Sequence, residues 1–313
     1  MLAAVSIIIC TCNRAEDLRQ TLEAIGCLAV PDAYQCDLTV VDNGSTDATA
    51  SLVQSLTLPN MPLRYLREPR RGKGYAYNSG IAASTGDILL FTDDDVRPPV
   101  DWIEGMCGPI LRGEADAIAG GIKLAPHLHR PWMKIMHIVW LASTDYLPEG
   151  ATLALIGANM AFSRHVLERV PQFDVEIGPG AKGHADDTLY SYQLEKAGFR
   201  IAMALDTAVI HHLSEDRLTR KAYAAAARKH GEFNAYIQWH WFHSDHPHPY
   251  AGLVRAFLAL WAHRLLHLPE WLTSPAVPAW ELAPLETFHS ARYYLLERKR
   301  PRNYEKFGLV KLR

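Results

Sequence analysis

Residues 88–99 read ILLFTDDDVRPP, an apolar run that ends abruptly in three consecutive aspartates. A short apolar run closed by polar residues predicts a buried β-strand, here residues 88–91. Asp93, Asp94 and Asp95 would repel one another at the end of that strand unless a positive charge lay beside them. A bound divalent cation, which prefers oxygen ligands, is one interpretation. A solvated acidic turn leading into the two prolines is the other, and the rest of the chain must decide between them.

Three earlier segments of the chain repeat the pattern of an apolar strand followed by a helix. Each is short and apolar throughout, and the stretch after it has apolar residues at helical spacing. Continuously apolar strands that alternate with helices are typical of a parallel sheet covered on both faces. The predicted strands are 5–10, 38–41, 63–66 and 88–91, and the predicted helices are 15–28, 48–56 and 75–84.

Polar segments follow three of these strands, at residues 11–14, 42–47 and 93–95. Ligands of open α/β sheets bind at the carboxyl ends of the strands, so we expect the three segments to converge on one crevice. The first loop lacks the GxGxxG pattern of dinucleotide-binding domains, and the chain contains no GxxxxGK[ST] phosphate loop. The sequence therefore disfavours both of those nucleotide-binding classes.

The second part of the chain has weaker patterns. Asp186 and Asp187 open a predicted helix, where acidic residues are also favoured simply as helix caps. After residue 213 the chain turns helical and holds five of the eight tryptophans. The strands predicted here are 117–121, 154–162, 201–205 and 208–210, and the helices are 132–141, 186–197, 215–239, 251–268 and 285–300.

The tail from residue 298 to residue 313 carries seven basic residues against one acid, Glu305. A solvated end is the interpretation we favour, because charge runs alone are weak signals. The alternative is attraction to anionic lipid headgroups or to a lipid-pyrophosphate substrate.

The composition excludes several classes of protein. A net charge of −2 and a pI near 6.7 argue against nucleic acid as a partner. Five cysteines in 313 residues do not suggest a disulfide framework, and no apolar stretch reaches the ~20 residues that span a bilayer. We expect a protein of the reducing cytoplasm. The basic tail suggests an alternative, in which the protein contacts the inner face of the membrane peripherally.

Seven motifs in the order seen here resemble those of family 2 glycosyltransferases. The resemblance spans residues 5–212 and implies the GT-A fold, a Rossmann-like mixed α/β sheet flanked by helices. It implies a catalytic domain at 1–213, with a nucleotide-binding half at 1–100 and an acceptor-binding half at 101–213, and a helical extension at 214–313. The motifs are SIIICTCNR, VVDNGSTD, GKGYAYNSG, FTDDD, GANMAFSR, the pair Asp186-Asp187 and AVIHH.

The resemblance implies a divalent cation, Mn²⁺ or Mg²⁺, that neutralises the diphosphate leaving group of a nucleotide sugar. Asp95 matches the acid that contacts the metal, Asp93 would face the ribose or the water shell of the metal, and Asp94 the nucleotide. A late histidine completes such metal sites. Both His211 and His212 fit that place, and the spacing to the following arginine favours His211.

Further donor contacts are implied by the same resemblance. Asp42 matches the acid that hydrogen-bonds the base, although an Asx turn explains it equally well. Lys73 lies between two glycines that clear space for a phosphate. Relatives often have Ala-Arg-Asn where this chain has Ala-Tyr-Asn at 76–78, so Lys73 or Arg71 would replace the missing arginine. The implied donor-binding residues are Thr11, Cys12, Asn13, Arg14, Asp42, Lys73, Asn78, Asp93, Asp94 and Asp95.

On the acceptor side, Asp187 matches the general base that inverting transfer requires. Asp186 stands where relatives have glutamate, which leaves its acceptor-binding role open. Two adjacent carboxylates raise each other's pKa, which suits a base. Asn159 and His184 are the remaining residues predicted for the acceptor and sugar pocket.

The leading hypothesis is therefore an inverting, metal-dependent glycosyltransferase. Its partners would be a nucleotide-diphosphate sugar and a saccharide, a lipid-linked molecule or a small molecule as acceptor. A nucleotidyltransferase and a non-catalytic module that binds sugar nucleotides are the alternatives. The presence of Asp95, Asp187 and His211 in one chain favours the enzyme.

Overall fold

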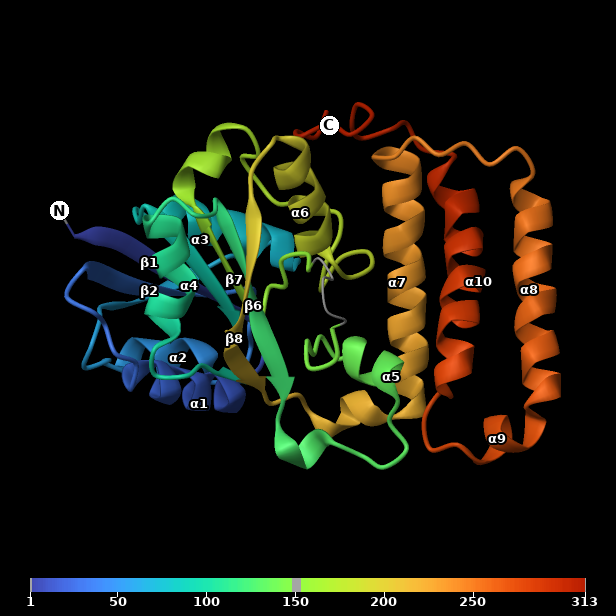
Figure 1. The fold of residues 1–313 in the computed structure, drawn as a ribbon, viewed down its shortest axis with the longest axis horizontal. Helices are drawn as coiled ribbons and strands as arrows, with labels where there is room; N and C mark the ends of the chain where they lie inside the picture. The colour runs from blue at the N-terminus through green and yellow to red at the C-terminus, as the bar shows by residue number, and fades with distance from the viewer. Residues whose placement is uncertain (1, 148–152, 313) are drawn as a thin grey trace.

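The computed structural model of the protein describes residues 2–147 and 153–312. A mixed eight-stranded sheet flanked by helices forms one part of the molecule, and a layer of long helices stands beside it (Figure 1). The strand order is β3-β2-β1-β4-β7-β6-β8-β5. The fold is thus the predicted α/β sheet flanked by helices, with helices also forming most of the chain after residue 213.

The first four strands are parallel, as the sequence predicted. Their apolar side chains pack on both faces of the sheet and form two buried clusters. The register aligns Thr11 with Asp42 and Cys10 with Asp93, so the polar segments after these strands emerge at one edge. The elements are β1 (Ala3–Thr11), α1 (Ala15–Gly26), β2 (Tyr34–Asp42), α2 (Thr49–Ser55), β3 (Leu63–Arg67), α3 (Lys73–Ala83) and β4 (Ile88–Asp93).

The sheet becomes mixed beyond β4, because β7 (Asn159–Ser163) runs antiparallel to both of its neighbours. The strands predicted at 201–205 and 208–210 form one strand, β8 (Ile201–His211), with a shift in its pairing register. The short β5 (Val96–Arg97) pairs with β8 so that Val96 lies opposite His211. That pairing brings the late histidine next to the three aspartates. The other elements here are α4 (Trp102–Leu111), β6 (Ala117–Leu124), α5 (Ile135–Val139) and α6 (Asp186–Lys196).

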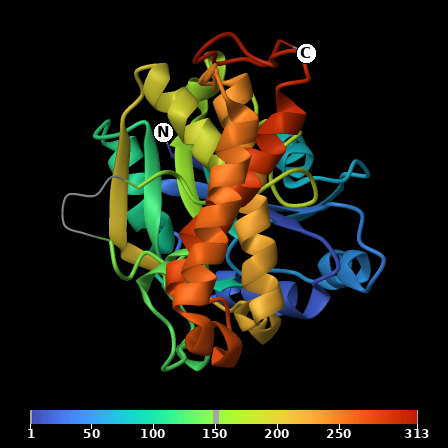
Figure 2. The ribbon, with the colours of Figure 1, turned by 90° about the vertical axis from the view of Figure 1, so that its right-hand side faces the viewer.

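The helical layer consists mainly of α7 (Arg220–His240), α10 (Ala279–Glu297) and α8 (Pro249–Leu266). Figure 1 shows them upright and side by side, and Figure 2 shows α8 on the outer side of the layer. Helix α7 begins later than predicted because the hydroxyl of Thr219 accepts a hydrogen bond from Ala222 N–H and caps it. The short α9 (Leu268–Thr273) connects α8 to α10. Within the described residues, no helix is both long enough and apolar enough to cross a membrane.

Candidate active site

A cavity of about 620 Å³ opens between the carboxyl ends of the parallel strands and the helical layer. Asp95 enters it from the end of β4 and Asp187 from the first turn of α6, although 92 positions separate them. The residues that end β1 and β8 and the start of α3 also line it. The crevice predicted from the strand ends is therefore present.

The aspartates after β4 are neutralised by side chains from other elements. Arg14 donates to Asp94 over 2.8 Å and to Asp95 over 2.7 Å, and Thr11 Oγ1 donates to Asp94 over 2.7 Å. Lys73 Nζ lies 2.5 Å from Asp93 Oδ1. Burial raises the pKa of Asp94 to about 7, against the opposing effect of Arg14. A solvated acidic turn is excluded, because Asp94 and Asp95 are buried.

Ligand atoms of Asp93, Asp95 and His211 lie within 4.8 Å of one another. Asp95 Oδ1 lies 3.2 Å from His211 Nε2, yet Asp95 Oδ1 and His211 Nδ1 are buried and make no hydrogen bond. Burial alone would raise the pKa of Asp95, but His211 and Arg14 hold it below the ordinary value. Two carboxylates and an imidazole with unused lone pairs are donors that suit Mn²⁺ or Mg²⁺. The residues present therefore fit a divalent cation.

Asp186 and Asp187 line the same cavity from the first turn of α6. Asp187 Oδ2 accepts from Gly157 N–H over 2.8 Å, which fixes its orientation. Burial and the charge of Asp187 raise the pKa of Asp186 to about 7, and burial raises that of Asp187. Asp186 Oδ2 is buried and makes no hydrogen bond. The pair can thus hold or release a proton near neutral pH.

Most of the predicted donor-side residues line the cavity. Thr11, Cys12, Arg14, Lys73 and the three aspartates do so. Asp42 does not, since its carboxylate is buried and accepts from Ser45 N–H and Tyr65 Oη. The carboxylate thus bonds the turn after β2, as the alternative interpretation expected, but at the third following residue and not at the second as in an Asx turn. Asn13 lies outside the cavity lining as well and accepts from Thr46 N–H.

Two predicted contacts are corrected by the structure. Asn159 is fully buried behind the cavity, where it accepts from Trp102 Nε1 and donates to the carbonyls of Gly121 and Thr207. Asn78 lies on the outer side of α3, and its amide both donates to and accepts from the backbone of Phe173. The amide groups of both asparagines are hydrogen-bonded within the fold, so neither side chain is placed to contact the sugar donor or the acceptor substrate.

The acceptor-side wall also contains His230, which the sequence did not single out as a site residue. His184 was predicted there, and His230 of α7 packs against it with ring centroids 5.8 Å apart. Burial, with smaller effects of His230 and Arg217, lowers the pKa of His184 to about 3. Trp140 lies against His230, with centroids 4.7 Å apart. No local pattern marked His230, because it is one polar residue among many on a long helix.

Comparison with known proteins finds relatives that match part of the chain. A curated glycosyltransferase, AglE of Haloferax volcanii, is 32% identical over 120 residues, which cover 38% of this chain and 39% of that protein. Glucosyl-3-phosphoglycerate synthase of Mycobacterium tuberculosis is 28% identical over 204 residues, covering 56% of this chain and 59% of the synthase. The chain thus matches between about two fifths and three fifths of the length of these relatives.

Among solved structures, a mannosyltransferase of Pyrobaculum calidifontis in complex with GDP-Man and Mn²⁺ has a TM-score of 0.65 at 22% identity, covering 95% of this chain and 88% of the other. S. aureus TarS 1-349 in complex with UDP has a TM-score of 0.53 at 14% identity, covering 98% and 94%. These likenesses establish the GT-A fold. The model of glycosyl transferase family 2 matches residues 6–170, more than half of the sequence, so the chain belongs to glycosyl transferase family 2.

Proposed function

We propose that the protein transfers a sugar from a nucleotide-diphosphate sugar to an acceptor hydroxyl, with inversion at the sugar carbon and with a divalent cation. The observation behind it is that the cluster of Asp93, Asp95 and His211 and the carboxylate of Asp187 line the same cavity. A leaving group could thus be held by the cluster while Asp187 deprotonates a hydroxyl in the same cavity.

The donor side supplies charge for the diphosphate. Asp95 and His211 would hold the cation, with Asp93 beside them, and a bound cation would neutralise the departing diphosphate. Arg14 and Lys73 already neutralise the aspartates over 2.5–2.8 Å. With a cation present, both side chains become available to the phosphate oxygens, which charge-assisted hydrogen bonds would hold in place.

The acceptor side supplies the base. Asp187 is oriented by Gly157 N–H, and its raised pKa makes it a stronger base than an exposed aspartate. Asp187 would take the proton of the acceptor hydroxyl as that oxygen attacks the sugar carbon and the bond to the diphosphate breaks. Asp186 and the neutral His184 would contact the acceptor from the same wall. Direct attack from the face opposite the leaving group is what would produce inversion.

We further propose the division of labour that the motifs imply. Residues 1–100 would bind the nucleotide, with Thr11 and Cys12 near the base, and residues 101–213 would bind the acceptor. Relatives are named for the synthesis of different products, succinoglycan and glucosyl-3-phosphoglycerate among them. The acceptor is therefore defined only as a molecule with a reacting hydroxyl, which can be a saccharide, a lipid-linked molecule or a small molecule.

Contact of the basic tail with a membrane is proposed in a narrower form. Arg300, Arg302 and Lys311 are ion-paired with acids of the same chain, and Arg313 lies outside the described residues. Arg298, Lys299 and Lys306 are the cations of the described tail left to face anionic headgroups. Co-sedimentation with phosphatidylglycerol vesicles tests this, and wild-type binding retained by the triple alanine variant of these three residues would contradict it.

The experiment that tests the proposed function is a thermal-shift screen of UDP-, GDP- and dTDP-sugars with and without Mn²⁺, followed by an assay of donor hydrolysis. We expect a Mn²⁺-dependent rise in melting temperature with one class of donor and slow hydrolysis of that donor. Binding without turnover under any acceptor would favour the non-catalytic module. Release of pyrophosphate instead of nucleoside diphosphate would favour a nucleotidyltransferase.

A further inference from the structure

The carboxyl-terminal tail, residues 298–312, leaves the helical layer and returns to the sheet domain. In Figure 1 it runs along the top of the molecule, from the end of α10 across toward α6. Phe307 N–H donates to Trp241 O at the end of α7, and Gln193 of α6 donates to the carbonyls of Gly308 and Leu309. The tail is therefore docked on two helices, contrary to the favoured interpretation of a solvated end.

A buried carboxylate is the centre of this docking. The side chain of Asp174 is fully buried and accepts from Tyr236 Oη over 2.5 Å, Tyr304 Oη over 2.7 Å and Lys311 Nζ over 2.6 Å. Tyr304 and Lys311 belong to the tail. Burial of a charge is costly unless it is paired and hydrogen-bonded, so Asp174 depends on the tail for two of these three donors.

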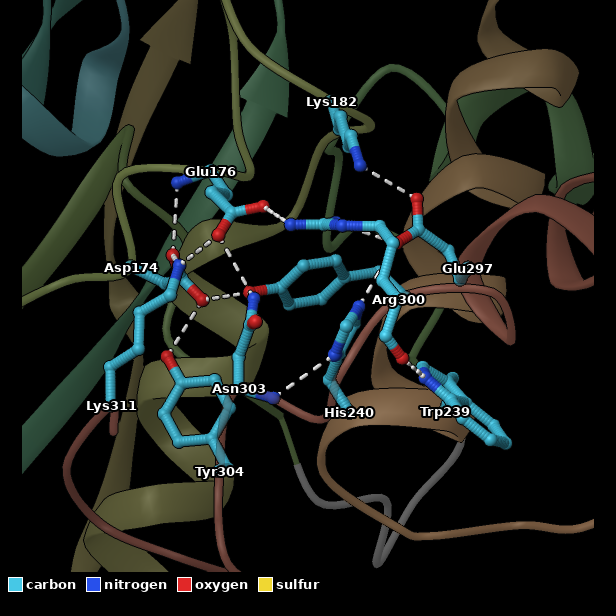
Figure 3. A network of polar contacts seen from close by, with 11 residues as sticks. Asp174, Glu176, Lys182, Trp239, His240, Glu297, Arg300, Asn303, Tyr304 and Lys311 are labelled. Atoms are coloured by element: carbon cyan, nitrogen blue, oxygen red, sulfur yellow. Dashed lines mark hydrogen bonds and ion pairs between the residues drawn. The ribbon is translucent and has the colours of Figure 1, made fainter. Parts of the chain in front are cut away.

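Glu176 is the second anchor, and Figure 3 shows the tail residues around it. Lys311 Nζ lies 2.8 Å from Glu176, Asn303 Nδ2 donates to it over 2.9 Å, and Arg300 also pairs with it. Asp174 and Glu176 open the segment 174–183, which we call the acceptor loop. The tail thus makes five polar contacts with the two acids at the beginning of this loop.

The far side of the acceptor loop contacts the active site. Pro179 O accepts from Lys73 N–H over 2.9 Å, at the first residue of α3. Gly178 has a φ of +103°, and a Cβ placed there would lie 2.8 Å from the carboxyl group of Asp186. The loop therefore lies against both the lysine that faces the aspartates and the first acid of the catalytic pair.

We propose that the tail is a positioning element of the active site, acting through the acceptor loop on Lys73 and Asp186. Lys311 is the residue on which this depends most, because it bridges both acids at a site where its side chain is 10% exposed. The inference rests on the proposed function for its effect on catalysis, but its structural part can be tested without any turnover.

The structural part is tested by hydrogen exchange on three full-length variants. Lys311→Met removes the charge and keeps the alkyl chain, and Lys311→Arg restores the charge. Arg302→Met is the matched control, since Arg302 is a tail cation whose partner Asp245 is 73% exposed. We expect Lys311→Met to speed deuterium uptake at least tenfold for the amides of Lys73 and Lys182, which donate to carbonyls of the loop. Wild-type uptake at both amides would overturn the proposal.

The catalytic part is tested with the nucleotide sugar and Mn²⁺ identified by the thermal-shift screen. At 25 °C we expect Lys311→Met to lower kcat of donor hydrolysis about tenfold and to change the donor KM less than threefold, because the described polar contacts that dock the tail are with α6, α7 and the acceptor loop and not with Asp93, Asp95 or His211. Lys311→Arg should recover most of kcat, and Arg302→Met should match the wild type. A lower melting temperature with unchanged kcat would reduce the tail to a stabiliser and overturn the proposal.

Two further outcomes remain informative. If the wild type hydrolyses no donor, the proposed function fails, and the exchange experiment still decides whether the tail positions the loop. If Lys311→Met does not fold, Tyr304→Phe removes a single hydrogen bond to Asp174 and leaves the ring in place. Its effects on exchange and kcat should be smaller and in the same direction, and their absence would count against the tail.

Discussion

The lining of the cavity has two parts that are built in different ways. The donor wall has Arg14, Asp93, Asp94, Asp95 and His211, and the acceptor wall has Asp186 and Asp187. On the donor wall, the charged residues follow directly from parallel strands whose register is fixed by an apolar core on both faces. On the acceptor wall, Asp186 and Asp187 follow a loop that is held by the backbone N–H of Lys73 at the start of α3 and by the side chains of Lys229 on α7 and Lys311 in the tail. The strand ends that carry the donor-wall aspartates are thus marked by local sequence patterns, whereas the position of the acceptor wall depends on contacts between residues far apart in sequence.

This difference suggests that substitutions on the two walls will have different effects on catalysis and on nucleotide binding. Changes on the acceptor wall should affect the chemical step and spare nucleotide binding, whereas changes on the donor wall should affect both. Substitutions of buried asparagines behind the walls should affect only stability. Five variants test this division.

The largest effect is expected for Asp187→Asn. An amide cannot take the proton of the hydroxyl, and a general base contributes roughly 10²–10⁴-fold to rate, so transfer should fall by about 10³-fold. Nucleotide-sugar affinity with Mn²⁺ should stay within threefold of wild type, because the metal ligands are untouched. Calorimetry measures the affinity, and a parallel loss of binding would contradict the assignment of Asp187 to the acceptor wall.

Next in size is Asp95→Ala on the donor wall, where His211→Ala is the companion variant. Either change removes a ligand atom from the cluster, so transfer should fall by about 10²-fold and nucleotide-sugar affinity at least tenfold. The Mn²⁺-dependent rise in melting temperature should disappear. Asp101→Ala, an exposed acid at the start of α4, is the control and should retain that rise. Full Mn²⁺ dependence in Asp95→Ala would remove the cluster from the proposal.

Asn159→Ala should lower the free energy of unfolding by about 3 kcal/mol, since it removes the partner of Trp102 Nε1 and the donor to the buried carbonyl of Gly121 and the part-buried carbonyl of Thr207. Chemical denaturation measures this. Donor affinity of the folded variant should equal that of wild type. A stable variant with weakened donor binding would restore Asn159 to the sugar pocket.

The same division explains what the sequence could predict. The strands of the first half, their parallel arrangement and the aspartates that close residues 88–95 were predictable, because periodicity and strand-end chemistry are local signals. Asn159 and Asn78 were misjudged because a polar residue in a motif can serve the fold as well as a ligand. His230 and the docking of Lys311 on Asp174 depend on contacts across 46 and 137 positions, to which no local pattern points.

Asp186→Asn should shift the pH profile of transfer. The pKa of Asp186 is raised to about 7 by burial and by Asp187, so the wild type should lose activity as the pH falls through about 7. Without the charge of Asp186, the pKa of Asp187 falls and the acidic limb should move to lower pH by roughly one unit. An unmoved limb would show that the two carboxylates do not share the proton.

The raised pKa has a second consequence for the same variant. A carboxyl whose pKa is higher in the folded state binds more protons there, so the free energy of unfolding decreases as the pH rises from about 4 to about 7. Asp186→Asn should flatten this decrease. Thermal melts at several pH values measure this dependence. If the stability of the variant fell with pH as steeply as that of wild type, Asp186 would not be the group responsible.

The smallest effect is expected for His212→Ala, beside the proposed ligand. His211 is buried with Nε2 near Asp95, whereas His212 is partly exposed and has its ring centroid 5.7 Å from that of His127. Adjacent residues at the end of a strand point to opposite sides, so His212 should not reach the cation. Transfer and Mn²⁺ affinity should change less than twofold. A loss of Mn²⁺ affinity as large as that of His211→Ala would exchange the two histidines and move the metal site to the other side of β8.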